Sequence, residues 1–412
     1  MTVHVVGAGV AGMVAALMLA RAGHAVTLHD AAPVAGGRCR ALPDGTDNGT
    51  HVLMGANRAA LRFLDAIGAR DGWIEPEPDG LPLFDLADGT ARRIAASPRA
   101  WRDPARRPPG LSAGGVLALL GMASGITDRP VATAMAKHPA LLRGFVEPLT
   151  VAALNTPVAQ ASSARLGQVL RRLGGAGAAR LLVAREGLGP NLIAPALAAL
   201  AQAGVALRLG ARLRALTTAE GRAVALHIGQ DSLAVAAGDA IILALPPWEA
   251  ARLILGLRVP DDHAPILNLH FARPGAGPVR FVGLLGGLVQ WVLVRPGGIS
   301  VTVSAADAEA EEPVDSLAPR AWAEIRQAAR AFALPGDWAQ APPPCRAVKE
   351  RRATPRHGVG FPPVAPRLPL RNLALAGDWT WGGLPATIEA AALSGEAAAK
   401  AVARQARRPG AA

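Results

Sequence analysis

The stretch Gly7-Ala8-Gly9-Val10-Ala11-Gly12 has the pattern G-x-G-x-x-G and decides the fold prediction. It directly follows an apolar stretch, residues 3–6, that reads as a strand, and it leads into a helix expected at residues 13–21. Gly7 permits a tight turn, Gly9 lets a pyrophosphate approach the backbone, and Gly12 allows close packing of the helix on the strand. The N–H groups at the start of this helix, around Val10 and Ala11, suit phosphate binding.

A second strand, expected at residues 25–29, completes a β-α-β unit and is followed by Asp30. The Asp30 carboxylate would accept hydrogen bonds from ribose hydroxyls. Gly36-Gly37-Arg38 comes a few residues later and combines a glycine pair with a guanidinium that can bind a phosphate through two hydrogen bonds. We therefore predict that Gly37 and Arg38 contact the same pyrophosphate. A plain β-α-β turn is the alternative interpretation of the glycine motif alone.

A second pair of turn motifs lies near the C-terminus. Leu375-Ala376-Gly377-Asp378-Trp379-Thr380 ends a strand expected at residues 373–376. Gly382-Gly383-Leu384-Pro385-Ala386-Thr387 then enters a long alanine-rich helix, expected from about Pro385. An ordinary turn at Gly377-Asp378 is the alternative here.

Both ends of the chain resemble the flavoproteins of the amine oxidase and phytoene desaturase superfamily, although these more often carry glutamate where Asp30 stands. The resemblance implies the cofactor FAD, with Asp378 on the ribityl chain or the phosphates. It also implies that the helix near Pro385 directs its positive end at the flavin O2 region. The cofactor contacts that it implies in the second half of the chain are Leu213, Gly377, Asp378, Pro385, Ala386 and Thr387.

Asp47-Asn48-Gly49-Thr50-His51 narrows the resemblance to the bacterial hydroxysqualene dehydroxylases of hopanoid biosynthesis, which carry a D-N-G-x-H segment. Three further stretches are similar to theirs: 153–157, 290–291 with 304–307, and 352–354. The chain departs from the pattern at Thr50, where glutamine is expected, and at Gly382, where threonine is commoner. These differences could alter polar contacts near the flavin, but neither removes a cofactor anchor.

The resemblance places His51 near the flavin ring, where it is our candidate proton source; a buried histidine bonded to backbone is the alternative. Asp47 would either orient His51 or cap a turn. The candidates for the wall of the substrate cavity are Asn155, Trp291, Trp379 and Trp381. For Asn155 a turn or helix cap is the alternative, and for both Trp379 and Trp381 it is packing against helices. Cys39 reads as a small packed hydrophobic residue.

Composition excludes several classes of protein. Hydrophobic residues make up 51% of the 412 residues and charged residues 18%, which excludes a disordered chain. The two cysteines, and histidines without metal-binding spacing, predict neither a disulfide framework nor a metal site. The net charge of +12 comes from scattered arginines, so we expect no nucleic-acid partner.

The sequence predicts a cytoplasmic protein, because strand-like sequence begins at Val3 and leaves no room for a signal peptide. The longest uncharged run, 187–207, contains prolines and is a poor membrane span. Peripheral attachment to the inner face of the membrane is a further prediction, with the apolar residues 116–122 and the basic cluster Arg102 to Arg107 as the contact.

We predict an α/β fold with a Rossmann-type FAD-binding domain and a second, α+β, substrate-binding domain. The FAD-binding domain is expected to combine residues 1–66, 186–250 and 350–412. The substrate-binding domain would comprise residues 67–185, where the sequence favours helices, and 251–349, where short β-type runs recur.

The implied activity is an FAD-dependent oxidoreductase that converts hydroxysqualene to squalene by hydride delivery to an allylic carbon and loss of water. Such a substrate, a long-chain isoprenoid, implies delivery from the membrane or from an upstream squalene-pathway synthase. An oxidative desaturase of carotenoid, phytoene or squalene type is the alternative. A flavin-binding or lipid-binding module without catalysis is the third interpretation.

Overall fold

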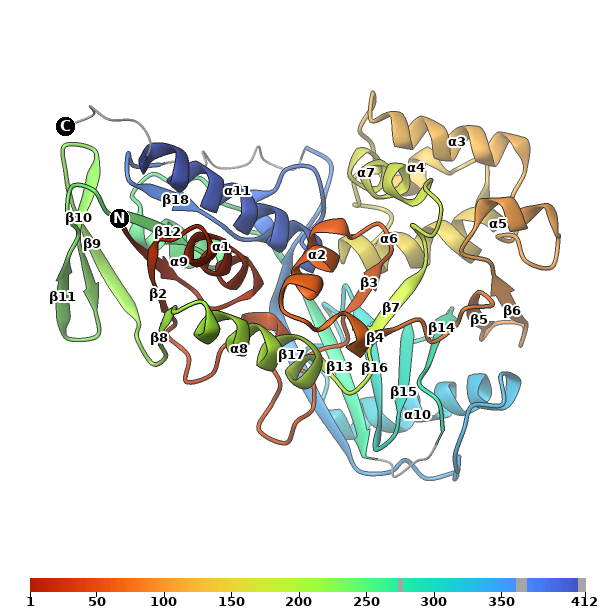
Figure 1. Ribbon diagram of the computed structural model, residues 1–412. Coiled ribbons are helices and arrows are strands. Elements are labelled where there is room, and N and C mark those ends of the chain that lie inside the picture. The colour runs from red at the N-terminus through yellow and green to blue at the C-terminus, as the bar shows by residue number, and fades with distance from the viewer. Residues whose placement is uncertain (273–276, 361–368, 407–412) are drawn as a thin grey trace.

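The computed structural model describes residues 1–272, 277–360 and 369–406, and its first large element is a parallel five-stranded sheet (Figure 1). The strand order is β18-β12-β1-β2-β8, and every neighbouring pair is parallel. The strands are β1 (Thr2–Val6), β2 (Ala25–His29), β8 (Ala206–Arg208), β12 (Ala240–Leu243) and β18 (Leu373–Leu375). This sheet, built from the start, middle and end of the chain, confirms the Rossmann-type prediction.

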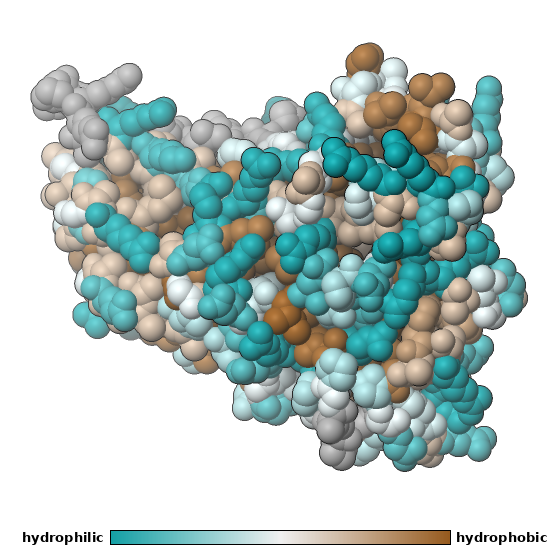
Figure 2. All heavy atoms as spheres, turned by 45° about the vertical axis from the view of Figure 1, so that its right-hand side comes forward, coloured by the Kyte–Doolittle hydropathy of each residue, from teal (hydrophilic) through white to brown (hydrophobic). Residues whose placement is uncertain are grey.

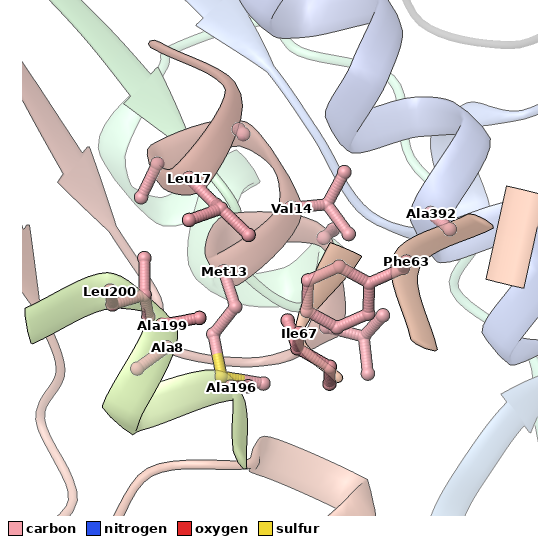
Figure 3. Packing of buried hydrophobic residues seen from close by; sticks show 14 of the residues in the cluster. Ala8, Met13, Val14, Leu17, Phe63, Ile67, Ala196, Ala199, Leu200 and Ala392 are labelled. Carbon is pink, nitrogen blue, oxygen red and sulfur yellow. The ribbon is translucent and has the colours of Figure 1, made fainter. Parts of the chain in front are cut away.

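Helix α1 (Val10–Arg21) is the centre of the packing on one face of this sheet. Its sequence is apolar almost all round, so it can be buried on every side, and Met13 is fully buried. Figure 3 shows Met13, Val14 and Leu17 among side chains from neighbouring elements. These elements are α2 (Arg58–Ala66) with Ile67 behind it, α8 (Ala194–Gln202) and α11 (Ile388–Ala406).

The opposite face of the parallel sheet is covered by a three-stranded antiparallel sheet and α9 (Pro247–Leu253). The strands of this cover are β9 (Leu213–Ala219), β10 (Arg222–Ile228) and β11 (Asp231–Ala234). Side chains alternate between the two faces along β1: Val3 and Val5 lie in the core around α1, whereas Val6 lies in the core beneath β9 and β10.

The second large sheet has seven strands in the order β17-β13-β16-β15-β14-β5-β6. Their bounds are β5 (Leu81–Asp85), β6 (Ala91–Ile94), β13 (His263–Ala272), β14 (Arg280–Leu285), β15 (Trp291–Arg295), β16 (Gly298–Ser304) and β17 (Cys345–Pro355). Helix α10 (Val314–Ala331) covers one face, where Trp322 packs against Phe271 with their ring centroids 5.2 Å apart. The other face is turned toward the segment that follows Asp47, because Gly49 and Thr50 contact Asn268 of β13.

A small third sheet, β3 (Val52–Met54), β7 (Leu181–Ala184) and β4 (Trp73–Ile74), lies beside a helical region. The helices of that region are α3 (Ala113–Ser124), α4 (Val131–Ala134), α5 (Pro139–Leu141), α6 (Glu147–Leu154) and α7 (Ser163–Leu173). The sequence favours helices over residues 67–185, and this expectation is correct only in part, because strands β4 to β7 also lie in the range. The strand β5 forms there because it pairs with β14, which lies about two hundred residues away along the chain.

The predicted domain bounds stay a prediction, and one of them falls within a strand. Residue 350 lies inside β17, which pairs with β13 along its length and belongs wholly to the seven-stranded sheet. The predicted ranges also include residues 273–276, 361–368 and 407–412, which lie outside the described residues.

His29 is a buried titratable group in the core beneath the parallel sheet. Its ring is 6% exposed, and neither ring nitrogen has a hydrogen-bond partner among the described residues. Burial, with smaller contributions from the nearby His4 and Arg208, lowers the pKa of His29 to about 4. The folded protein therefore holds this imidazole in its neutral form.

We expect the free energy of unfolding to decrease as the pH falls from 6.5 toward 4. The pKa of His29 is below its ordinary value in the folded protein, so as the pH falls the unfolded chain binds the proton first. The stability that comes from the neutral ring is therefore fully present above pH 6.5 and is lost as the pH falls toward 4. The loss should reach on the order of 3 kcal/mol below pH 4. Urea unfolding of His29→Leu at several pH values should show a flatter profile than that of the unchanged protein, and an equally steep profile would contradict this assignment.

Candidate functional site

The turn between β1 and α1 is shaped by glycines that no other residue could replace without moving the backbone. Gly7 has a φ of +109°, and a Cβ there would lie 2.2 Å from the Ala244 carbonyl oxygen. A Cβ on Gly12 would lie 1.8 Å from the Gly7 carbonyl oxygen. Gly9, in contrast, has nothing within 4 Å of its Cβ position and leaves open space at the start of α1.

That open space lies where the N-terminus of α1 can bind an anion. Gly9 is the N-cap residue, and neither a side-chain cap nor an acidic residue lies in the first turn. Val10 and Ala11 form that turn and are both 6% exposed. Backbone N–H groups and the positive end of the helix dipole therefore remain for a phosphate group.

Gly36 and Gly37 form a second glycine turn beside the first. Gly37 has a φ of +56°, and a Cβ there would lie 3.3 Å from the Gly9 Cα. The Gly36 N–H donates to the Ala8 carbonyl at 2.8 Å and fixes the two turns together. Because Gly37 lets its turn approach Gly9 this closely, and Gly9 leaves open space at the start of α1, the site suits a group that approaches two backbones at once, such as a pyrophosphate.

Asp30 lies next to this space at the end of β2. Its Oδ2 accepts the Ala8 N–H at 2.6 Å, and its Oδ1 accepts the Ala32 N–H at 2.7 Å. Each oxygen retains acceptor capacity for a ribose hydroxyl. The Asp30 carbonyl also accepts the Ala211 N–H at 2.7 Å, just before the start of β9. Leu213, predicted as a cofactor contact, begins β9 and is 4% exposed within the core there.

Arg38 joins the two ends of the chain. Its guanidinium donates to Asp378 at 2.6 Å and to the Ala353 carbonyl at 2.5 Å. Burial would lower the pKa of Arg38, but the Asp378 carboxylate outweighs this and raises it. Gly377, directly before Asp378, has a φ of +137° and donates its N–H to Ser394 of α11. The N-terminal and C-terminal motifs thus surround one site, although 340 residues separate Arg38 from Asp378.

Two of the predicted flavin contacts before α11 are already engaged by the protein. The Ala386 N–H donates to His357 Nε2 at 3.0 Å, so this N–H is not available to a cofactor. The Thr387 hydroxyl accepts the Ala390 N–H at 3.2 Å and caps α11, with its own proton directed to the Pro385 carbonyl at 3.2 Å. A flavin would therefore meet the backbone of this turn rather than these two polar groups.

Asp47 caps a turn rather than orienting His51. It is 4% exposed and accepts the Leu188 N–H at 2.6 Å and the guanidinium of Arg295 at 3.0 Å. Gly187 has a φ of +128°, and a Cβ there would touch the Asp47 carboxylate. Asp47 thus links its segment to β15 and to the chain before α8.

His51 is half-buried, with its Nδ1 2.9 Å from the Gly49 carbonyl oxygen. Because a carbonyl only accepts, Nδ1 carries a proton. Burial by itself would lower the pKa of His51, but the neighbouring Cys39, the Gly49 carbonyl and Asp47 outweigh it and raise the pKa to about 9. The bond to backbone corresponds to the alternative interpretation of His51, and the raised pKa adds that the ring is cationic at neutral pH.

Trp291 lies on the face of the seven-stranded sheet opposite α10, where side chains of the small third sheet pack against it. Its ring stacks on Phe281 with a centroid distance of 5.3 Å and an interplanar angle of 4°. A Cβ on Gly283 would lie 2.7 Å from this ring, so a glycine is needed for the indole to lie across β14. Val52, Val183 and other apolar side chains complete a hydrophobic cluster there. This aromatic pair is an apolar surface suited to a hydrocarbon.

The other three predicted cavity residues lie elsewhere. Asn155 is 3% exposed with a φ of +47° at the end of α6, and its side chain binds the Ala264 carbonyl, Thr354 and the Ala305 N–H. Trp379 is 4% exposed in the core beneath the parallel sheet and donates to the Leu245 carbonyl. Trp381 borders an open groove along α11 with Leu393, Glu396 and Lys400. For Asn155 the cap interpretation and for Trp379 the packing interpretation therefore match the geometry.

The sequence reading missed His357, Arg295 and Asn268. His357 and Arg295 bind residues of predicted motifs from segments far along the chain, so no local pattern marks them. Asn268 could have been noticed in the sequence, because it is a polar residue within the apolar run of β13. Among residues 1–272, 277–360 and 369–406, no cluster of three His, Cys, Asp or Glu side chains could hold a metal ion.

Comparison with known proteins agrees with this geometry. The profile of the family described as flavin containing amine oxidoreductase matches residues 10–281. Hydroxysqualene dehydroxylase of Rhodopseudomonas palustris is 38% identical over 97% of this chain and 98% of its own length. The protein of that name from Sinorhizobium fredii is 35% identical over 96% and 97%.

Two more distant similarities help to weigh the alternatives. Zeta-carotene desaturase of Synechocystis is 38% identical, but only over 74 residues, 17% of this chain. The solved structure of cyclohexylamine oxidase from Brevibacterium oxydans is 15% identical with a TM-score of 0.70 and covers 99% of both chains, which shows the fold.

The cofactor is FAD, because the family is one of flavin-containing enzymes, and the space between the two glycine turns beside Asp30 suits a pyrophosphate. The chain belongs to the hydroxysqualene dehydroxylase family, within the flavin containing amine oxidoreductases.

Proposed function

We propose that this protein is an FAD-dependent hydroxysqualene dehydroxylase that forms squalene. The observation that carries the proposal is the similarity to hydroxysqualene dehydroxylases along nearly the whole chain, at 32–38% identity. When bound and reduced, FAD supplies the hydride that forms the new C–H bond at the allylic carbon, while the C–O bond breaks and the hydroxyl takes up a proton and leaves as water.

The chain's own residues would bind both FAD and the substrate. Gly7, Gly9, Gly12 and Gly37 leave room for the pyrophosphate, with Asp30 on the ribose and Arg38 held at the site by Asp378. Asp378 is 6% exposed, and one carboxylate oxygen binds Arg38 while the other accepts the Trp379 N–H. A backbone contact from Gly377 and Pro385 to the flavin half stays a prediction.

The substrate would lie beside the aromatic pair on the face of the seven-stranded sheet opposite α10. The stacked rings of Phe281 and Trp291 and the surrounding valines and leucines exclude water there. An aromatic face also stabilises positive charge that develops on an allylic carbon as the hydroxyl departs. Asn155 and Trp379 are not part of this surface.

We assign the proton for the departing hydroxyl to His51. Its Nδ1 donates to the Gly49 carbonyl, which leaves Nε2 to carry the transferable proton. The pKa of about 9 keeps the imidazolium charged at neutral pH. Asp47 supports this charge from a distance while its own hydrogen bonds hold the segment in place.

An oxidative desaturase is the weaker alternative, because the similarity to zeta-carotene desaturase covers only 17% of the chain. A flavin-binding module without catalysis would be yellow but would form no product in the single turnover described below. A lipid-binding module without catalysis would need no flavin. An absorption spectrum of the purified protein separates it from both enzymes, since a flavoprotein is yellow.

Attachment to an anionic membrane surface is a further part of the proposal. None of the helices within the described residues has the length and hydrophobicity needed to cross a bilayer. On α3, however, Val116, Leu117 and Leu120 are 39%, 69% and 59% exposed, and Ile126 just behind it is 86% exposed. Figure 2 shows hydrophobic residues grouped at the upper right of the molecule, where α3 lies in Figure 1.

The charge around this apolar face suits anionic lipid. No acidic residue occurs between Asp103 and Asp128. The guanidinium of the exposed Arg171 lies 3.6 Å from the Cβ position of Gly125, at the end of α3, and the Arg102 to Arg107 cluster is also exposed. Exposed leucines beside arginines are typical of helices that insert into the headgroup region. Delivery by a neighbouring squalene-pathway synthase stays a prediction.

The proposed reaction is tested by an anaerobic single turnover. The bound flavin is photoreduced, hydroxysqualene is added, and flavin reoxidation and product mass are followed together. We expect squalene in an amount equal to the flavin reoxidised. If reduced protein does not reoxidise, while oxidised protein desaturates a polyene, the desaturase alternative replaces the proposal.

The role of His51 predicts a pH profile. The activity kcat/KM should fall as the pH rises through about 9, because the acid loses its proton, and Cys39→Ser should move this limb to lower pH by removing a group that raises the pKa. His51→Asn should lower kcat/KM by roughly 100-fold or more and abolish the limb. The control is His24→Asn, at the turn before β2. An unchanged rate in His51→Asn with its flavin bound would contradict the assignment.

Membrane attachment is tested by flotation with vesicles that contain phosphatidylglycerol. The double variant Leu117→Ser/Leu120→Ser should lose most of the vesicle-bound fraction at unchanged thermal stability, since both side chains are exposed. Leu255→Ser, at a leucine behind α9 that is more exposed than either Leu117 or Leu120, is the control and should float normally. Equal flotation of the double variant and the control would contradict the proposed contact.

A further inference from the structure

His357, which follows β17, connects three segments that are distant in sequence. It is 3% exposed. Its backbone N–H donates to the Thr156 hydroxyl at 3.0 Å, and its carbonyl accepts the Ser162 N–H at 2.9 Å. Its ring Nε2 accepts the Ala386 N–H at 3.0 Å, in the turn that leads into α11. The ring is thus fixed by its backbone before it meets this turn.

Arg165 of α7 holds the same turn from a second direction. Its NH1 donates to the Gly382 carbonyl at 2.8 Å and to the Leu384 carbonyl at 3.1 Å. Burial lowers the pKa of Arg165, while Asp128 acts in the opposite direction. Together the two side chains bind three backbone groups within residues 382–386.

This turn leads into the N-terminus of α11, whereas the body of the helix packs on α1, where a Cβ on Gly395 would lie 2.3 Å from the Ala11 carbonyl oxygen. Gly382 and Gly383 do little to hold the turn in one conformation, because glycine adopts many backbone conformations. The Thr387 cap stabilises the first turn of the helix but does not anchor it to the rest of the protein. Arg165 and His357 therefore anchor the turn itself, while Glu389 anchors the first turn of α11 by accepting the Ala60 N–H at 2.9 Å and the Arg172 guanidinium at 3.2 Å.

We propose that His357 and Arg165 are positioning residues for FAD, which hold the Gly382–Thr387 turn so that the start of α11 faces the flavin half of the cofactor. This rests on the FAD site of the proposed function and not on the identity of the substrate. The positive end of α11 favours the negative charge of reduced flavin, so a displaced turn weakens FAD binding and favours the oxidised state.

The protonation state of the His357 imidazole keeps its hydrogen bond with the Ala386 N–H the same over the working pH range. Burial lowers the pKa of His357 to about 3, with a smaller contribution from Arg165, so the ring stays neutral at every working pH. Nε2 therefore remains an acceptor for the Ala386 N–H. Glutamine can offer a carbonyl oxygen in place of this nitrogen, whereas leucine leaves the N–H unpaired in a buried place.

The experiment compares His357→Leu, His357→Gln and Arg165→Gln with the unchanged protein in three measurements that need no substrate. These are the Kd for FAD after reconstitution of the apoprotein, the midpoint potential of the bound flavin, and its visible circular dichroism. For His357→Leu and Arg165→Gln we expect about ten-fold weaker FAD binding. We also expect a potential about 30 mV more negative, the two-electron equivalent of a ten-fold change. His357→Gln should recover most of both.

His4→Leu is the matched control, since His4 is buried in β1 at 6% exposure and faces the core beneath the parallel sheet. Its FAD affinity and flavin potential should be those of the unchanged protein. Unchanged affinity, potential and dichroism in both His357→Leu and Arg165→Gln would overturn the proposal. If His357→Leu does not fold, Arg165→Gln decides alone. If the variants show the expected changes in these three measurements but the unchanged protein forms no squalene, the result counts against the proposed substrate and not against this inference.

Discussion

The close approach of backbone to backbone around the start of α1 is the constraint on which the rest of the structure depends. Gly7 packs against the backbone just after β12, and Gly12 packs against the backbone of Gly7. A Cβ on Gly395 of α11 would come within 2.3 Å of the Ala11 carbonyl oxygen. Each of these contacts excludes every side chain, because even one methyl group would overlap a backbone atom. The same absence of side chains leaves the N–H groups of the first turn open to a phosphate. Packing of the core and binding of the dinucleotide thus have one steric cause.

From this centre the site extends to parts of the chain that no local pattern connects. Arg38 with Asp378, Asp47 with Arg295, and His357 with Ala386 each join segments between 29 and 340 residues apart. The Arg38 side chain is 43% exposed, so solvent screens its ion pair with Asp378 and keeps the stabilising effect of that pair small. Its contribution is to hold a guanidinium and a carboxylate at the edge of the cofactor space. Function here depends on the placement of groups more than on the energy of their pairing.

Two histidines show how surroundings decide chemistry. His51 lies in the D-N-G-x-H segment and His357 binds the turn before α11, and burial disfavours the charge on each ring. His51 has Cys39, a carbonyl and Asp47 as neighbours, so its cation is stabilised. His357 has the Arg165 cation nearby and accepts an N–H, so it stays neutral. One ring can therefore donate a proton while the other serves as a fixed acceptor.

The sequence by itself determined the fold class, the cofactor and the family, because these rest on local patterns: the glycines of the first turn, Asp30 at the end of its strand, Gly377-Asp378, and the D-N-G-x-H segment. It also named Trp291 as a candidate wall of the substrate cavity, and the structure places this residue, partly buried, in the second sheet. Only the tertiary structure decided that Trp379 lies in the core, that Asn155 ends a helix, and that the Ala386 N–H is bound by His357. The physical reason is that a side chain's partners are set by which strands and helices pack together. A strand such as β5 forms where a distant strand offers hydrogen bonds, and no pattern within it can report that.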